Sequence, residues 1–284
     1  MRHGFLLVSK PKGPTSHDIV DTVRARLHER SVGHLGTLDP AAQGLMVLAV
    51  GAKSLKVVEL FQGLSKEYDA FIRLGAVSTT YDAEGVIEPS LKKGWEPPEQ
   101  AVIQRVVQDH FLGRIDQTPP AHSAVKIGGE RAYRKARQGK NVAMPARKVE
   151  ISACNVLQYA FPELALHIAC SSGTYIRSIA HDLGQLLRCG AYLESLVRTR
   201  VGDWRLADAV SPEKATWTDV LPLKDVLSTL PSIELTDLQM EDARCGRPVG
   251  LCIARESIGW HAGLPACILA PVQNAQSSHA RKVF

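Results

Sequence analysis

The chain has 284 residues, of which 45% are hydrophobic, and a formal net charge of +5 at pH 7. This length and composition are enough for one large domain, or for one domain with a small appendage, and they exclude a largely disordered chain. The apolar stretch Phe5–Val8 is too short for a signal peptide or a membrane span, so we expect a cytoplasmic protein that does not enter membranes.

The first part of the chain alternates short strands with helices. We predict a strand over Gly4–Val8, a loop rich in proline and glycine, and a helix over 17–27 that is capped by Ser16. A further loop leads into a buried strand over Leu45–Val50, and a strand of alternating character covers residues 66–78. No internal repeat or heptad pattern is present.

The second part continues the mixture of helices and strands. The segment before Gly113 has helical spacing of apolar residues and ends at that glycine. A strong strand follows over Leu164–Ser172, and Gly173 then turns the chain into a helix with an apolar face that includes Ile176 and Leu183. The sequence therefore predicts an α+β fold with a substantial sheet.

The six cysteines are scattered, with no CxxC pair and no histidine at zinc-ligand spacing. We interpret them as reduced and mostly buried, and we predict neither a metal site nor a cofactor. The segment VGAKS (Val50–Ser54) lacks the spacing of a phosphate-binding loop, and no GxGxxG occurs. These patterns argue against a metal hydrolase and against a nucleotide-dependent enzyme.

Positive charge is concentrated in one segment. Residues 123–148 hold eight Lys or Arg and one Glu, so this segment carries +7 and the rest of the chain about −2. Good helix formers over Glu130–Gln138 predict a short helix that places Arg131, Arg134 and Lys135 on one face. A charged helix face is often only solvated surface, but this density favours salt-sensitive contacts with the phosphates of a nucleic acid.

A single acid, Asp39, stands in the glycine-rich segment SVGHLGTLDPAAQG, directly before a hydrophobic strand. An aspartate followed by a proline is a standard helix N-cap with a favoured first helical residue. The alternative is a catalytic carboxylate that the loop presents to a substrate. Both interpretations are compatible.

Arg177 is expected in the first turn of the helix that follows Gly173. The helix dipole is positive there, so a cation is mildly disfavoured unless another group compensates. A carboxylate would do so well, because the planar guanidinium can hold it with two hydrogen bonds. The alternative is an arginine that simply extends into water.

Several segments together resemble one family. GHLGTLDPAAQG is similar to the signature of the TruB-type tRNA pseudouridine synthases, usually close to GHxGxLDPxAxG, although Leu35 and Thr37 stand where Thr and Ala are common. SKPKGPTSHD, KEYDAFIRLG and YDAEG match further family motifs, and TPPAHSAVKIGGERAYRKARQG resembles the RNA-clamping insertion. SSGTYIRSIAHDLGQLLRCGAYLESLVRTRVG matches a later segment, so the resemblance runs in family order from Phe5 to about Gly202.

The resemblance implies three catalytic residues. Asp39 corresponds to the catalytic aspartate, Tyr68 to the tyrosine that stacks on the target base and takes part in proton transfer, and Arg177 to the arginine that pairs with the aspartate. It also implies residues that bind substrate or RNA, namely His34, Tyr175, Leu196, Lys10, Arg131, Arg134 and Lys135. Taken singly, each has a plainer interpretation: Tyr68 as core, Tyr175 as packing at a helix end, and His34 as a hydrogen bonder in a turn.

The activity that the resemblance implies is isomerisation of the uridine at position 55 in the T loop of tRNA. The glycosidic bond breaks, the base rotates, and a carbon–carbon bond forms without cofactor or metal. The basic insertion is typical of the stand-alone bacterial enzymes, so we expect a monomer that binds the T arm directly, without a guide RNA. The alternative is a catalytically idle RNA-binding or tRNA-folding protein with the same fold.

The implied fold has a mixed, largely antiparallel central sheet flanked by helices. We expect a catalytic domain over 1–229, with the basic insertion at about 115–147, and a reduced PUA-like RNA-binding domain over 230–284. The stretch ARCGRPV resembles that small β-rich domain, and the polar tail is expected to fray. The glycines around Asp39 are expected to leave room for a nucleotide backbone.

Overall fold

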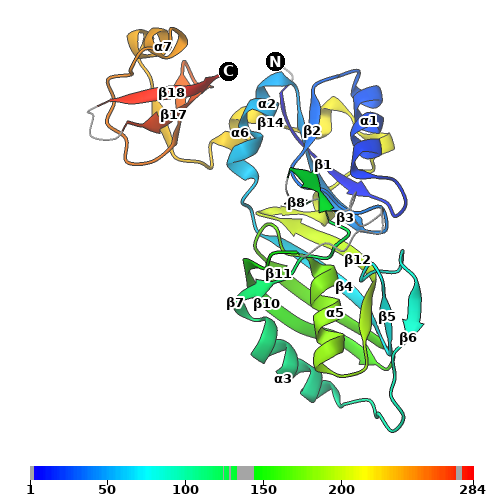
Figure 1. Cartoon of the computed structure of the whole chain (residues 1–284). Coiled ribbons are helices and arrows are strands. Elements are labelled where there is room, and N and C mark those ends of the chain that lie inside the picture. Colours follow the sequence, from blue (N-terminus) through cyan, green and yellow to red (C-terminus); the bar gives the residue numbers. More distant parts are fainter. Residues whose placement is uncertain (1–2, 124, 128, 133–143, 273–276) are drawn as a thin grey trace.

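The computed structural model describes residues 3–123, 125–127, 129–132, 144–272 and 277–284 (Figure 1). The main body is built on a ten-stranded sheet in the order β14-β1-β3-β12-β4-β11-β10-β7, with β2 on β3 and β13 on β12. All neighbours in it are antiparallel except β3 and β12, so the sheet is mixed and largely antiparallel, as predicted. In the part of the chain that is described, no helix is long and apolar enough to cross a membrane.

The bounds of the main-body elements are as follows. The strands are β1 (Gly4–Lys10), β2 (Val32–His34), β3 (Gln43–Val50), β4 (Lys66–Leu74), β7 (Gly113–Gln117), β10 (Arg147–Ala160), β11 (Glu163–Cys170), β12 (Ala191–Val201), β13 (Trp204–Arg205) and β14 (Val220–Pro222). The helices are α1 (Ser16–Leu27), α2 (Ala52–Val57), the 3-10 turn η1 (Val58–Phe61), α3 (Gln100–Phe111), α5 (Ile176–Leu186) and α6 (Leu223–Leu227). Two small ladders pair β5 (Ala76–Ser78) with β6 (Ile87–Pro89), and β8 (Lys126–Ile127) with β9 (Glu130–Arg131).

The sheet is covered differently at its two ends. Strands β1 and β3 are apolar on both faces, because α1 packs on one face and α2 and α6 lie on the other. In β4 the residues alternate, so that Tyr68 and Ile72 are buried beneath α5 while Glu67 and Phe71 lie on the opposite, more exposed face. Helices α3 and α5 lie side by side on that buried face (Figure 1).

Several boundaries differ from the predicted ones for local reasons. The N-cap of α1 is Thr15 and not Ser16, since the Thr15 hydroxyl and the Asp18 carboxylate form a reciprocal capping box. The strand predicted over 66–78 breaks at Gly75, which has a φ of 90°. The helix predicted from Glu130 does not begin there, because Glu130 pairs with Ile127 in the β8–β9 ladder.

The C-terminal residues form a second, four-stranded sheet beside the main body (Figure 1). Its elements are β15 (Ser232–Glu234), α7 (Asp237–Arg244), β16 (Ser257–His261), β17 (Leu264–Pro271) and β18 (Ser278–Val283). The region is β-rich, as predicted. The expectation that the polar tail frays is wrong for β18, since this strand pairs with β17 along its length and thereby satisfies its backbone groups.

Candidate active site

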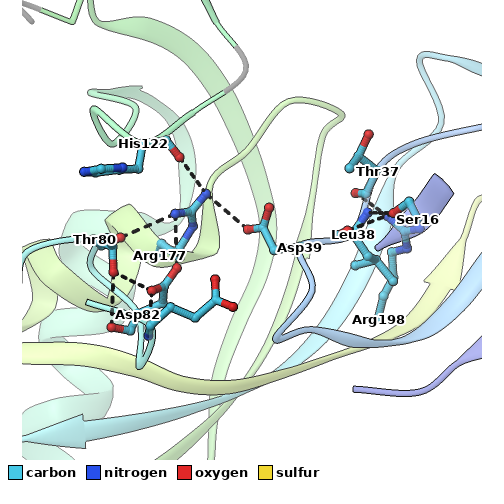
Figure 2. Close-up of polar contacts among 10 residues, drawn as sticks. Ser16, Thr37, Leu38, Asp39, Thr80, Asp82, His122, Arg177 and Arg198 are labelled. Carbon is cyan, nitrogen blue, oxygen red and sulfur yellow. Dashed lines mark hydrogen bonds and ion pairs between the residues drawn. The ribbon is translucent and has the colours of Figure 1, made fainter. Parts of the chain in front are cut away.

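The structure brings Asp39 and Arg177 together, although they come from distant parts of the chain. Arg177 is the second residue of α5, and its Nη2 lies 3.1 Å from Oδ2 of Asp39 (Figure 2). The Arg177 side chain is 10% exposed, whereas that of Asp39 is 50% exposed. The ion pair that the family resemblance implies between Arg177 and Asp39 is thus present, and half of the Asp39 side-chain surface is exposed.

A second carboxylate, Asp82, binds the other side of the guanidinium. Its Oδ2 lies 3.1 Å from Nη1 of Arg177, and its side chain is almost fully buried. Asp82 is held in turn, because its Oδ1 accepts hydrogen bonds from the Thr80 hydroxyl and from the backbone of Glu84. Asp82 lies in the motif YDAEG, but the sequence alone indicates no role for it, since only the fold brings its loop to α5.

Backbone carbonyls complete the surroundings of Arg177. The carbonyl of Thr80 accepts from Nη1 at 3.4 Å, and that of His122 accepts from Nη2 at 3.2 Å (Figure 2). Through these hydrogen bonds and ion pairs, Arg177 connects the Asp39 loop, the Asp82 loop and the segment before β8. The unfavourable end of the α5 dipole is offset by two carboxylates.

The backbone on both sides of Asp39 is tied to neighbouring elements. The Ser16 hydroxyl, at the start of α1, donates to the carbonyl of Leu38 at 2.8 Å and accepts from its N–H at 2.9 Å. Lys10 Nζ, at the end of β1, donates to the carbonyls of Pro40 and Ala42 at 3.2 and 2.7 Å. These contacts fix the direction in which the Asp39 side chain leaves the loop.

The hydrogen bonds of Lys10 all go to backbone carbonyls of the chain itself. Its side chain is buried, and its ammonium donates to three carbonyls, those of Pro11, Pro40 and Ala42. Burial lowers the pKa of Lys10, and the nearby Asp39 carboxylate opposes this fall. Lys10 thus supports the loop and does not offer a free cation to RNA phosphates.

Tyr68, Leu196 and Arg198 share the helix-covered face of the sheet. In the ladder between β4 and β12, Tyr68 lies opposite Arg198, and Ala70 lies opposite Leu196. Burial raises the pKa of Tyr68, and the positive charge of Arg198 works against this rise. The negative charge of Asp39 also raises this pKa, to a smaller extent.

His34 and Tyr175 border the same region. His34 ends β2, its Nδ1 is buried without a hydrogen-bond partner, and burial lowers its pKa below 6.5, so the ring is neutral at pH 7. Tyr175 is the N-cap of α5, and its backbone is fixed by two hydrogen bonds with the Gln117 side chain. The Arg147 guanidinium lies 4.4 Å from the centroid of the Tyr175 ring.

The basic segment is described only in part. Arg131 belongs to β9, where its backbone pairs with that of Lys126, while Arg134 and Lys135 lie outside the described residues. The expectation that glycines near Asp39 leave space for a nucleotide is wrong at Gly44. A Cβ there would lie 2.4 Å from the carbonyl oxygen of Arg198, so the space is filled by β12. In the described chain, no group of three His, Cys, Asp or Glu residues is placed to hold a metal ion.

A family model and curated proteins match this chain. The model described as TruB family pseudouridylate synthase (N terminal domain) matches residues 24–176. The tRNA pseudouridine synthase B of Opitutus terrae is 40% identical over 223 residues, which cover 78% of this chain and 90% of that protein. The tRNA pseudouridine synthase B of Heliobacterium modesticaldum is 39% identical over 267 residues, which cover 92% and 85%, respectively.

Solved structures share the fold at low identity. A chain in the crystal structure of a Cbf5-Nop10-Gar1 complex matches with a TM-score of 0.74 and 21% identity, covering 100% of this chain and 85% of that one. A chain of an H/ACA RNP bound to a substrate RNA containing 2'-deoxyuridine matches with a TM-score of 0.71 and 20% identity, covering 99% and 84%. These matches confirm the predicted fold class.

Proposed function

Because this chain belongs to the TruB family of pseudouridine synthases, we propose that it isomerises uridine to pseudouridine in tRNA, at position 55 of the T loop. Asp39 is the catalytic carboxylate in this proposal, and Arg177 is its partner. The relatives' name supports tRNA as the substrate class, while the choice of position 55 rests on the resemblance of the basic insertion to that of the stand-alone enzymes.

One observation carries the proposal: a half-exposed carboxylate is paired with a buried guanidinium that also binds a second, buried carboxylate. Asp39 is held 3.1 Å from Arg177, and Arg177 is held 3.1 Å from the buried Asp82. The ionised form of a carboxylate is the effective nucleophile or electrostatic catalyst, and the guanidinium offers that form an ion pair. The fixed guanidinium also limits the positions that the Asp39 side chain can take, which lowers the entropic cost of reaching the transition state.

The reaction leaves the atomic composition of the uridine unchanged. The bond between N1 of the base and C1′ of the ribose breaks, the base rotates, and C5 bonds to the same C1′. The proton on C5 is lost and N1 gains one, so there is no net oxidation or reduction. We assign proton transfer to Tyr68, which is a neutral phenol at pH 7 because burial raises its pKa.

A uridine in a folded loop must leave its stack before Asp39 can reach it. In our proposal Tyr68 and Tyr175 replace the lost stacking, Leu196 lines the pocket, and neutral His34 offers its unpartnered Nδ1 to the flipped nucleotide. The basic segment with Arg131, Arg134 and Lys135 supplies the contacts with phosphates.

We further propose the division of labour between the parts of the chain. Residues 1–229 carry the chemistry, and residues 230–284 act as a reduced PUA-like RNA-binding domain. The protein then works as a cytoplasmic monomer on the T arm itself. Activity on bare tRNA transcripts, with no added RNA or protein, tests whether the protein acts on the T arm without a guide RNA or a protein partner.

Release of tritium from C5 of uridine tests the activity. Transcripts of tRNA labelled at that position are incubated with the wild type and with Asp39→Ala. We expect release by the wild type alone, with both proteins binding the transcript. Binding without tritium release by the wild type would show a catalytically idle RNA-binding protein and would overturn the proposed enzymatic activity.

Two further comparisons test the target and the basic segment. A transcript with cytidine at position 55 should give no release, and undiminished release from it would refute that position.

Neutralising Arg134 and Lys135 together should weaken tRNA binding. It should also reduce the slope of log K against log salt concentration by about one or two, since each phosphate contact contributes to this slope. Unchanged binding would refute the proposed role of the basic segment in binding tRNA.

A further inference from the structure

Arg198 is a buried cation beside the site, and the chemistry proposed above does not use it. It lies in β12 and is 1% exposed. Its Nε donates to the carbonyl of Leu45 at 2.7 Å, its Nη1 to that of Thr37 at 3.4 Å and its Nη2 to that of Gly36 at 3.1 Å. Thr37 and Gly36 immediately precede the Leu38–Asp39 pair.

No carboxylate forms an ion pair with Arg198 among the residues that the structure describes. Its positive charge lowers the pKa of nearby Lys10, Lys66 and His34. Burial lowers the pKa of Arg198 itself, and Tyr68 opposes this fall. A buried charge without a counter-ion is costly, so it is tolerated only where its donors are used.

The donors of Arg198 are used on two sides. On one side they hold the loop that leads to Asp39, and on the other side Tyr68 lies directly opposite Arg198 in the sheet. Figure 2 shows Asp39 between two groups of contacts, with Arg177 on one side and the Arg198, Thr37 and Leu38 group on the other. Arg177 holds the carboxylate, and Arg198 holds the backbone that carries it.

We propose that Arg198 is a positioning residue for the isomerisation, which sets the Asp39 loop and the Tyr68 hydroxyl in a fixed relation so that both address the same flipped uridine. This inference rests on the proposed function. The planar fork is essential to it, because three carbonyls and a phenol in different directions require donors that an ammonium cannot place at once.

Arg198→Lys keeps the charge but removes the fork, and Arg200→Lys is its matched control. Arg200 lies in the same strand and pairs with Glu67 at 3.1 Å and with Asp203 at 3.4 Å. Single-turnover rates at saturating tRNA and the Kd for tRNA are measured for both variants. We expect Arg198→Lys to slow the reaction about tenfold to a hundredfold while changing Kd less than about threefold, and Arg200→Lys to change neither by more than about twofold.

A second measurement tests the contact with Tyr68 even if Arg198→Lys fails to fold. Tyr68→Phe removes the hydroxyl that Arg198 holds in this proposal, and Tyr159→Phe is the control because the Tyr159 hydroxyl is buried without a partner. We expect Tyr68→Phe to lower the melting temperature by about 3–10 °C, as loss of a hydrogen bond to a charged group does. Tyr159→Phe should not lower it.

The outcomes separate this inference from the proposed function. If the wild type forms pseudouridine and a folded Arg198→Lys matches its rate, or if Tyr68→Phe and Tyr159→Phe melt alike, the inference is overturned and the function stands. If the wild type forms none, the proposed function is overturned, and the positioning role falls with it.

Discussion

At the scale of single residues, Asp39 combines an open side chain with a fixed backbone. Half of its side chain is exposed, yet Ser16 binds both the N–H and the carbonyl of Leu38 just before it. Beyond it, Lys10 holds the carbonyl of Pro40. A catalytic group gains from such support because a misplacement of about 1 Å can cost a large part of the rate.

Ser16→Ala tests this support at the scale of one hydroxyl. The change leaves two backbone groups of Leu38 without their partner, so we expect a loss of about 1–3 kcal/mol in the free energy of unfolding and a slower single turnover. Ser54→Ala is the matched control, since the Ser54 hydroxyl is equally buried but has no hydrogen-bond partner. Urea unfolding and tritium release are measured for both; equal effects of the two substitutions would contradict the role of Ser16.

At the scale of elements, the contact between β3 and β12 decides whether the site exists. It is a short parallel contact in which Val197 pairs with Gln43 and Arg198 with Gly44. This contact sets the strand that carries Leu196 and Arg198 beside the end of the Asp39 loop. Gly44 has a φ of 109°, and a Cβ on it would lie within 2.6 Å of the backbone nitrogen of Arg198.

Gly44→Ala should therefore separate β3 from β12. Gly113→Ala is the control, because Gly113 also has a positive φ, of 86°, but nothing lies near the position of its Cβ. Both variants bear the strain of the left-handed backbone, and only Gly44→Ala adds a clash, so we expect it to cost about 1–3 kcal/mol more. Urea unfolding gives the difference; equal losses would show that the close approach is unimportant.

At the scale of the whole molecule, the C-terminal sheet packs against the main body through apolar and charged groups. Ile268 of β17 is fully buried and belongs to the cluster that contains Phe5 and Phe61. At the edge of this cluster, Glu59 lies 2.7 Å from Arg281 and 3.1 Å from Lys282. We expect Ile268 to contribute more to the free energy of unfolding than the Glu59 ion pairs do, because a partly exposed ion pair stabilises a protein much less than a buried isoleucine.

Ile268→Ala and Glu59→Gln separate these contributions. We expect Ile268→Ala to lower the free energy of unfolding by about 2–5 kcal/mol, because it leaves a cavity. Glu59→Gln should lower it by less than about 1 kcal/mol, because the Glu59 side chain is about one third exposed and its pairs are screened by water. Denaturant titrations measure both, and a larger loss for Glu59→Gln would mean that charge holds the two sheets together.

The stability of the molecule should also depend on pH. Burial is the main cause that lowers the pKa of His3, His34 and His181 below 6.5. Below pH 6.5 the unfolded chain binds protons on these residues that the folded chain does not bind, so the contribution of these histidines to the free energy of unfolding falls as the pH is lowered through this range. His34→Asn should reduce this slope between pH 7 and 5; a slope that stays the same would exclude a contribution from His34.

The sequence by itself determined the elements and the chemistry that Asp39 can offer. Periodicity placed α1, β3, β11 and α5 close to their observed bounds, because local burial and turn residues decide such elements. The first-turn position of Arg177 suggested a carboxylate partner without excluding an arginine that extends into water, and the choice of Asp39 came from the family resemblance. Strand β12 was not predicted, since its polar and apolar residues give no clear alternation.

Only the tertiary structure decided which side chains meet. Asp82 became the second partner of Arg177, Lys10 became a support of the loop, and Arg198 became a buried link between that loop and Tyr68. Each of these contacts joins segments that are far apart in the chain, so the spacing of the residues in the sequence does not predict it. The physical reason is that strand order and register, set by the burial of both faces of the sheet, determine which distant residues become neighbours.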